Sequence, residues 1–139
     1  MVDLGAYFER IGYADAPRPD IATLRALHFA HACAIPFENL STLIGEPVPL
    51  DVGALVDKLI TRRRGGYCFE QNTLFQHVLE SLGFDVLPLA ARVVWNAADT
   101  NPRTHMALLV SIAGTRYLCD VGFGAVTMTA PLELEPGRV

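Results

Sequence analysis

Residues 64–72 read Arg-Gly-Gly-Tyr-Cys-Phe-Glu-Gln-Asn, and they place Cys68 between a glycine pair and the start of a helical pattern. Apolar residues then recur at helical spacing, which predicts a helix from about Cys68 to Leu82 that ends at Gly83. The first turn of a helix exposes unpaired backbone N–H groups and the positive end of the helix dipole. A thiol at that position loses its proton more easily, and the thiolate is the reactive form of cysteine.

The chain before this stretch is predicted to be helical. Apolar residues at three- and four-residue spacing predict helices over 4–11, 21–34 and 52–63, with Asp20 and Asp51 as N-caps of the last two. Residues 37–50 contain several proline and glycine breakers, so we expect a loop there. The helical part, residues 1–83, therefore carries Cys68.

From Phe84 onward the apolar pattern changes to that of strands. It predicts strands over 86–95, 105–112 and 115–121, the last two joined by a hairpin turn at residues 113–114. Pro88 marks the first strand as an edge strand or a bulged one. Helices followed by antiparallel strands indicate an α+β fold, with residues 1–83 and 84–139 as its two parts.

The three predicted strands are too few to form a closed sheet. The last predicted strand would leave an apolar edge unpaired, although Leu132 and Leu134 in the tail are also strand-like. We therefore expect either a homo-oligomer that covers this edge or a further part of the protein that does so.

Composition excludes several classes of function. The 139 residues are 51% hydrophobic and carry a net charge of −4 without a basic stripe, so we expect no nucleic-acid partner. Three cysteines are an odd number, which disfavours a secreted disulfide framework. The N-terminus lacks a signal-peptide pattern, and no apolar run is long enough to span a membrane. We expect a cytoplasmic protein without a membrane partner.

Cys68 is the best candidate nucleophile among the three cysteines. An isolated cysteine is more often a buried structural thiol, and we assign Cys33 and Cys119 to that role because one lies late in a helix and the other inside a strand. Cys68 differs because a helix start would activate it and because Gly65-Gly66 would permit the close approach of a ligand.

His105 and Asp120 are predicted to pair with each other. His105 shares one side of its strand with Ala107 and Leu109, where we expect a packed region and where an unpaired imidazole would be costly. Asp120 lies in an apolar strand, and a buried carboxylate also needs a partner. Pairing satisfies both residues and leaves the second imidazole nitrogen for Cys68. A thiol, an imidazole and a carboxylate are the set of groups used in nucleophilic acyl transfer.

The same residues have two other possible uses. His105 could be a core histidine that is satisfied locally, without a catalytic role. Three cysteines and a histidine could in number fill a zinc site, but no ligand spacing in the sequence organises them, so we expect no metal.

Four segments in this order resemble the arylamine N-acetyltransferase family. They are residues 35–40 (IPFENL), residues 64–70 (RGGYCFE), residues 104–106 (THM) and residues 120–124 (DVGFG), and the resemblance extends from about residue 3 to the end of the chain. It implies that Cys68 is the nucleophile, His105 its base and Asp120 the acid that orients the imidazole.

The resemblance also assigns residues around this triad. It implies a structural ion pair between Glu38 and Arg64. It further implies a group of substrate-binding positions, with Phe37 and Phe123 lining the acceptor pocket and Gly124 beside the acetyl-CoA cleft; the group is Phe37, Thr104, Phe123 and Gly124.

The implied fold has a helical first domain, an antiparallel β-barrel second domain around a cysteine-protease-like core, and an α/β lid. Chains of the family are about twice as long as this one, so we expect this sequence to stop within the second domain and to lack the lid. The implied reaction is ping-pong transfer of acetyl from acetyl-CoA, a substrate and not a bound cofactor, through a cysteine thioester to an arylamine or arylhydrazine.

Two alternatives remain open at this point. A thiol hydrolase of the transglutaminase or papain type uses the same three groups but passes the acyl group to water. The chain could also be an inactive, truncated fragment that serves in an interaction.

Overall fold

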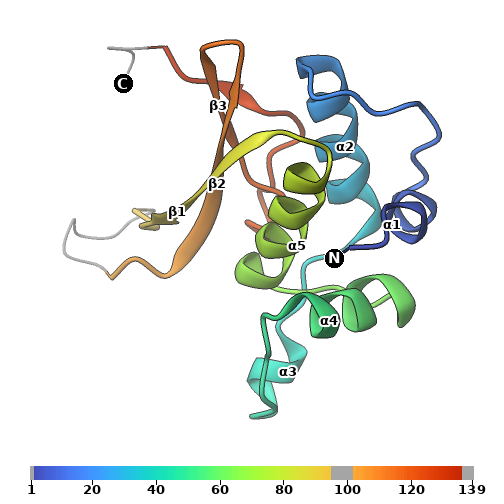
Figure 1. Cartoon of the computed structure of the whole chain (residues 1–139). Helices are drawn as coiled ribbons and strands as arrows, with labels where there is room; N and C mark the ends of the chain where they lie inside the picture. The colour runs from blue at the N-terminus through green and yellow to red at the C-terminus, as the bar shows by residue number, and fades with distance from the viewer. Residues whose placement is uncertain (1, 95–101, 136–139) are drawn as a thin grey trace.

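Helix α5 (Cys68–Ser81) lies between a β-sheet and the two N-terminal helices in the computed structural model, which describes residues 2–94 and 102–135 (Figure 1). Its buried side chains include Leu74, Phe75, Val78 and Leu79, all inaccessible to solvent. The same helix therefore supplies the centre of the hydrophobic core and, at its first residue, the predicted nucleophile.

The N-terminal helices form where the apolar spacing predicted them. Helix α1 spans Leu4–Ile11, helix α2 spans Ile21–Ala34, and helix α4 begins at Val52 and runs to Leu55. Asp20 caps α2, since its Oδ1 accepts the Thr23 N–H at 2.8 Å, and Asp51 caps α4 in the same way. The end of α5 is confirmed as well, because Gly83 has a φ of 86°.

Two stretches before Cys68 differ from the prediction. Residues 37–50 contain one helical turn, α3 (Leu40–Leu43), which forms because no breaker precedes Gly45. The single helix expected over 52–63 changes after α4 into a π-helix, η1 (Val56–Thr61). There the Arg10 guanidinium, which comes from α1, binds the Leu59 carbonyl at 2.9 Å. A partner so distant in sequence leaves no trace in the local pattern.

The strands within the described residues form one antiparallel sheet in the order β1-β2-β3-β4. Their bounds are β1 Asp85–Ala91, β2 His105–Ile112, β3 Thr115–Cys119 and β4 Leu132–Glu133. The predicted hairpin joins β2 to β3 through Ala113 and Gly114, whose φ angles of 48° and 84° are both positive, as a type I′ turn requires. Pro88 lies on the edge strand β1, as predicted.

The expected ends of two strands need comment. The first was expected to reach residue 95, whereas β1 ends at Ala91; residues 95–101, which include most of the expected connection, lie outside the described residues. The third was expected to reach residue 121, but the last residue of β3 paired with β2 is Cys119, and the next N–H, that of Asp120, bonds to a histidine.

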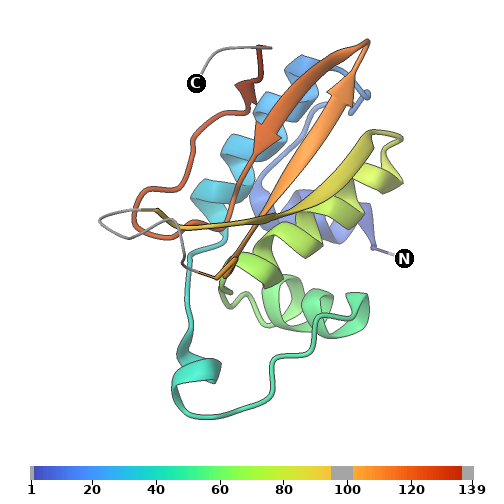
Figure 2. The same cartoon turned by 90° about the vertical axis from the view of Figure 1, so that its left-hand side faces the viewer.

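The edge of β3 is not left bare. Strand β4 pairs with it, placing Leu132 opposite Leu118 and Glu133 opposite Tyr117. The expectation of an unpaired β3 edge is therefore wrong for this part of the strand. Within the described residues the sheet remains open, with β1 and β4 at its two edges (Figure 2). The α+β class is confirmed, and the described sheet is not a closed barrel.

The core occupies the face of β2 that carries Met106, Leu108 and Val110, which pack with the buried side chains of α5. His105 lies on the other side of β2 with Ala107, and both are buried, at 7% and 5% exposed. The prediction that this side of the strand faces a packed region is therefore confirmed, although α5 packs on the opposite face. No helix in the described part of the chain is both long and apolar enough to cross a lipid bilayer.

Candidate active site

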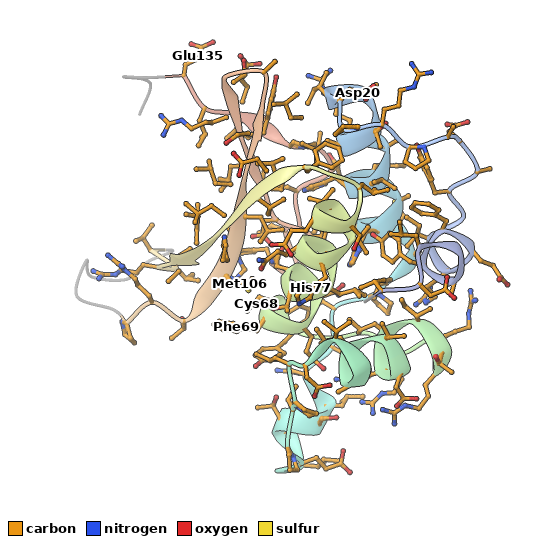
Figure 3. All side chains as sticks on the ribbon, in the orientation of Figure 1. Asp20, Cys68, Phe69, His77, Met106 and Glu135 are labelled. Atoms are coloured by element: carbon orange, nitrogen blue, oxygen red, sulfur yellow. The ribbon has the colours of Figure 1, made fainter. Side chains whose placement is uncertain are left out.

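Cys68 is the first residue of α5 and is 8% exposed (Figure 3). Its position at the helix start is thus as predicted, and Tyr67 forms the N-cap. The Tyr67 N–H donates to Glu70 Oε2 at 3.1 Å, so a side chain from the first turn satisfies this backbone donor. Cys68 Sγ lies 3.9 Å from the Thr104 carbonyl oxygen, which brings the thiol to the start of β2.

A row of buried and partly buried charges leads to this helix start. Lys58 Nζ lies 2.7 Å from Glu70 Oε1 and 3.8 Å from Glu38 Oε1, and Arg64 Nη2 lies 2.6 Å from the same Glu38 oxygen. We call Arg64, Glu38, Lys58 and Glu70 the ion row. Because Glu70 also accepts the Tyr67 N–H, the row connects the loop before α5 to the first turn that carries Cys68.

His105 and Asp120 form the closest polar contact near the thiol. His105 Nε2 lies 2.6 Å from Asp120 Oδ2, and both side chains are buried. The hydrogen bond to Asp120, and then the bond to Cys68, raises the pKa of His105 to about 9, although burial opposes this shift. The imidazole is therefore positively charged at neutral pH, and its Nδ1 is left for the thiol.

Asp120 is held by donors on two sides. Its Oδ1 accepts from Asn72 Nδ2 at 3.0 Å and from the Gly122 N–H at 2.9 Å. Burial by itself would raise the pKa of Asp120, but the hydrogen bonds from His105, Asn72 and Gly122 outweigh it and lower that pKa. The carboxylate is thus ionised and fixed in orientation.

Asn72 and Gln71 are functional candidates that sequence reasoning missed. Asn72 also donates to the Met106 carbonyl at 2.8 Å and accepts the Val121 N–H at 3.1 Å, which joins α5 to β2 and to the turn after β3. Gln71 Nε2 donates to the Pro36 carbonyl at 2.9 Å. One signal for Asn72 was present: it follows Cys68 by four residues, which puts both on one helix face.

The glycines near the site are used for packing within the chain. A Cβ on Gly65 would lie 2.0 Å from the Pro36 carbonyl oxygen, and one on Gly66 would lie 2.9 Å from Glu70 Cβ. The glycine pair was expected to admit a ligand, but the group that approaches it is the chain itself. A Cβ on Gly122 would lie 2.9 Å from Cys68 Cα, so that glycine lets the turn after β3 reach the helix start.

Aromatic side chains from two segments lie beside the triad. The Phe123 ring is 5.0 Å from the His105 ring in an edge-to-face arrangement, which covers the imidazole. Gly124 has a φ of 95°, and a Cβ there would contact the Phe37 ring at 3.4 Å. Phe37 is 44% exposed, and Thr104 is exposed at the side chain while its carbonyl faces Cys68. The predicted substrate-binding residues therefore lie together beside Cys68 and His105.

Neither of the other two cysteines is placed like Cys68. Cys33 is exposed, Cys119 is buried and burial raises its pKa to about 12, and all three cysteines are free thiols. A surface cavity of about 280 Å³ lies along the ion row, and each of its cations is paired with an acidic side chain. Among the described residues no three histidine, cysteine or acidic side chains are placed to hold a metal ion.

Comparisons with known proteins agree on one family. The family model described as N-acetyltransferase matches residues 20–139. The arylamine N-acetyltransferase of Mycolicibacterium smegmatis is 53% identical over 99% of this chain and 52% of its own length. The Escherichia coli K12 enzyme of the same name is 49% identical over 94% of this chain and 47% of its own.

Solved structures give the same result. The arylamine N-acetyltransferase of Salmonella typhimurium superposes with a TM-score of 0.93 at 46% identity, covering 99% of this chain and 51% of that one. The Mycobacterium marinum enzyme in complex with CoA gives a TM-score of 0.91 at 51% identity, covering 99% of this chain and 52% of that one. The chain thus spans about half the length of the relatives it matches.

Proposed function

This chain belongs to the arylamine N-acetyltransferase family, and we propose that it transfers an acetyl group from acetyl-CoA to the nitrogen of an arylamine or arylhydrazine. The observation that supports this most strongly is the arrangement of Cys68 at a helix start beside a charged His105–Asp120 pair. The CoA complex of the Mycobacterium marinum relative supports the acetyl donor.

In the first half-reaction the Cys68 thiolate attacks the carbonyl carbon of the acetyl thioester. A new carbon–sulfur bond forms, the bond to the CoA sulfur breaks, and the His105 imidazolium gives its proton to the departing sulfur. The products are acetyl-Cys68, CoA and a neutral imidazole. Backbone N–H groups at the start of α5 are suited to stabilise the oxyanion that forms on the way.

In the second half-reaction the amine nitrogen attacks acetyl-Cys68. Neutral His105 takes the proton from that nitrogen, the bond to Cys68 sulfur breaks, and the amide is released. This restores the thiolate and the imidazolium. Asp120 acts throughout by accepting the hydrogen bond from Nε2, which directs Nδ1 toward the thiol and supports the positive charge.

The surroundings of the triad suit the two substrates. We assign the acceptor ring to the aromatic surface of Phe37, which is exposed, and Phe123, which is partly buried. We assign the acetyl donor to the side of Gly124 and Thr104. Residues 1–83 then supply the nucleophile, and residues 84–139 supply the base and its orienting acid. We also propose that residues 84–139 belong to a β-barrel domain and that the core around Cys68 resembles that of cysteine proteases. We further propose that the protein forms a homo-oligomer.

The test separates acetyl transfer from hydrolysis and from an inactive fragment. We expect release of CoA from acetyl-CoA to rise with added arylamine, and to vanish in Cys68→Ala but not in Cys33→Ala, whose thiol is exposed on α2. CoA release that does not depend on the amine would instead support the thiol hydrolase. A folded protein whose Cys68 resists both acetyl-CoA and iodoacetamide would support the interaction fragment.

A further inference from the structure

His28 is a buried histidine that the proposed mechanism does not use. It lies on α2, is fully buried, and meets the Phe75 ring edge to face at 6.0 Å. Its Nε2 lies 3.2 Å from the backbone nitrogen of Asp120, whose N–H donates to it. His28 is separated from Asp120 by most of the chain, yet the two are in direct contact.

This contact fixes the protonation of the ring. An Nε2 that accepts a hydrogen bond carries no proton, so a neutral His28 has its proton on Nδ1. Nδ1 is buried and has no hydrogen-bond partner. An unpaired buried donor lowers stability, and such a group in a native protein calls for an explanation.

The Asp120 N–H supplies that explanation. Strand β3 ends at Cys119, so this N–H lies beyond the last backbone pair of the sheet and needs another acceptor. An apolar residue in place of His28 would remove the unpaired Nδ1–H but would leave the Asp120 N–H unpaired. Only the second of these groups belongs to the residue that orients His105.

We propose that His28 is a positioning residue for the acetyl-transfer site, whose neutral ring accepts the Asp120 N–H and thereby holds that carboxylate on His105. The catalytic meaning of this inference rests on the proposed function. The effect of His28, on α2, on the orientation of Asp120 toward His105 does not depend on the proposed function.

The groups around His28 are compatible with this role. Burial lowers the pKa of His28 to about 4, opposed by the Asp120 carboxylate, so the ring is neutral at neutral pH. His31, on the same helix, is also buried, and burial lowers its pKa to about 4. It uses both nitrogens elsewhere, with Tyr7 Oη at 2.9 Å and Gln71 Oε1 at 2.8 Å, and does not compete for Asp120.

The wild-type protein gives the first test. Long-range ¹H–¹⁵N spectra at neutral pH distinguish the tautomers of each histidine, and His28→Gln, His77→Asn and Asp120→Asn assign the signals. We expect a neutral His28 with its proton on Nδ1. A proton on Nε2, or a charged ring, would overturn the proposal.

Two substitutions of opposite geometry give the second test. Glutamine places its amide oxygen near the position of Nε2, whereas asparagine places it near that of Nδ1. In His28→Asn we expect the titration midpoint of His105, about 9 in the wild type, to fall by about one unit, and the corresponding midpoint in the pH profile of Cys68 modification by iodoacetamide to fall by the same amount. His28→Gln should retain most of both values.

His77→Asn is the matched control, because His77 lies on the surface of α5 and pairs with Glu80. It should leave the His105 midpoint unchanged. If His28→Asn also leaves it unchanged, the proposal is wrong; if that variant does not fold, the tautomer of the wild type decides. Neither readout requires acetyl transfer, so a chain inactive with acetyl-CoA still tests the inference.

Discussion

His105 owes its charge at neutral pH to one carboxylate. The hydrogen bond to Asp120 is the largest cause that raises the pKa of His105 to about 9, and the two atoms lie 2.6 Å apart. Asp120→Asn keeps the size of the side chain and removes its charge. We expect the His105 midpoint, followed by histidine NMR, to fall toward its ordinary value of 6.5.

The control for this prediction is Asp57→Asn. Asp57 is an exposed carboxylate paired with Arg62, and its loss should leave the His105 midpoint unchanged. A midpoint near 9 in Asp120→Asn would show that Asp120 does not govern the charge of the imidazole.

The pairing of His105 with Asp120 was predictable at this scale because each group is costly alone. A buried imidazole and a buried carboxylate both need partners, and pairing the two satisfies both, although a locally satisfied core histidine was an alternative. Asn72 was not predictable in that way, since an uncharged amide inside a helix is tolerated in many surroundings. Its contacts reach Met106 and Asp120, and no local pattern specifies them.

At the scale of elements, the start of α5 depends on the buried pair Lys58–Glu70. Lys58 comes from η1, and the side chains of the pair are 10% and 2% exposed. Lys58→Met leaves Glu70 buried without its cation, which we expect to lower the free energy of unfolding by about 3–5 kcal/mol. Urea unfolding measures this loss.

The double variant Lys58→Met/Glu70→Gln should recover most of the free energy of unfolding that Lys58→Met loses, because a glutamine oxygen still accepts the Tyr67 N–H without a buried charge. Arg62→Met is the matched control, since its ion pair with Asp57 is exposed and should be worth less than about 1 kcal/mol. Equal losses in Lys58→Met and Arg62→Met would contradict the proposed importance of the buried pair.

The elements themselves were predictable where a local pattern determines them. Asp20 and Asp51 cap helices, Gly83 ends one, and residues 113–114 turn a hairpin because each acts on its immediate neighbours. The π-helix η1 and the pairing of β4 were not predictable, because their partners come from α1 and from β3.

For the whole molecule, the buried histidines set how stability varies with pH. His28 and His31 have pKa values lowered by burial from 6.5 to about 4, so the unfolded chain binds more protons than the folded one between these values. Their contribution to stability is therefore lost as the pH falls from 6.5 to 4, by on the order of 3 kcal/mol each.

His105 acts in the opposite direction. Its pKa is raised from 6.5 to about 9, so its contribution is complete below pH 6.5 and is lost as the pH rises to about 9. We therefore expect the free energy of unfolding, measured in urea across pH 4 to 9, to be greatest near pH 6.5. A constant value between pH 7 and pH 5 would contradict the assignment of His28 and His31 as buried and neutral.

The α+β arrangement was predictable from the change of apolar period at Phe84, because that period is a property of the sequence itself. The face of β2 that packs against the core was not predictable, since His105 and Met106, on opposite faces, are both buried. The side on which α5 packs decided it, and that is a tertiary contact.

The most direct test of the proposed function is to look for the acetyl-enzyme. The protein is mixed with acetyl-CoA without an amine, its intact mass is measured, and peptide mapping separates Cys68 from Cys33 and Cys119. We predict one added acetyl group, located on Cys68, absent from Cys68→Ala and removed when an arylamine is added. Acetylation of Cys33 or Cys119 at an equal rate, or an acetyl group on Cys68 that an arylamine does not remove, would contradict the proposed role of the triad.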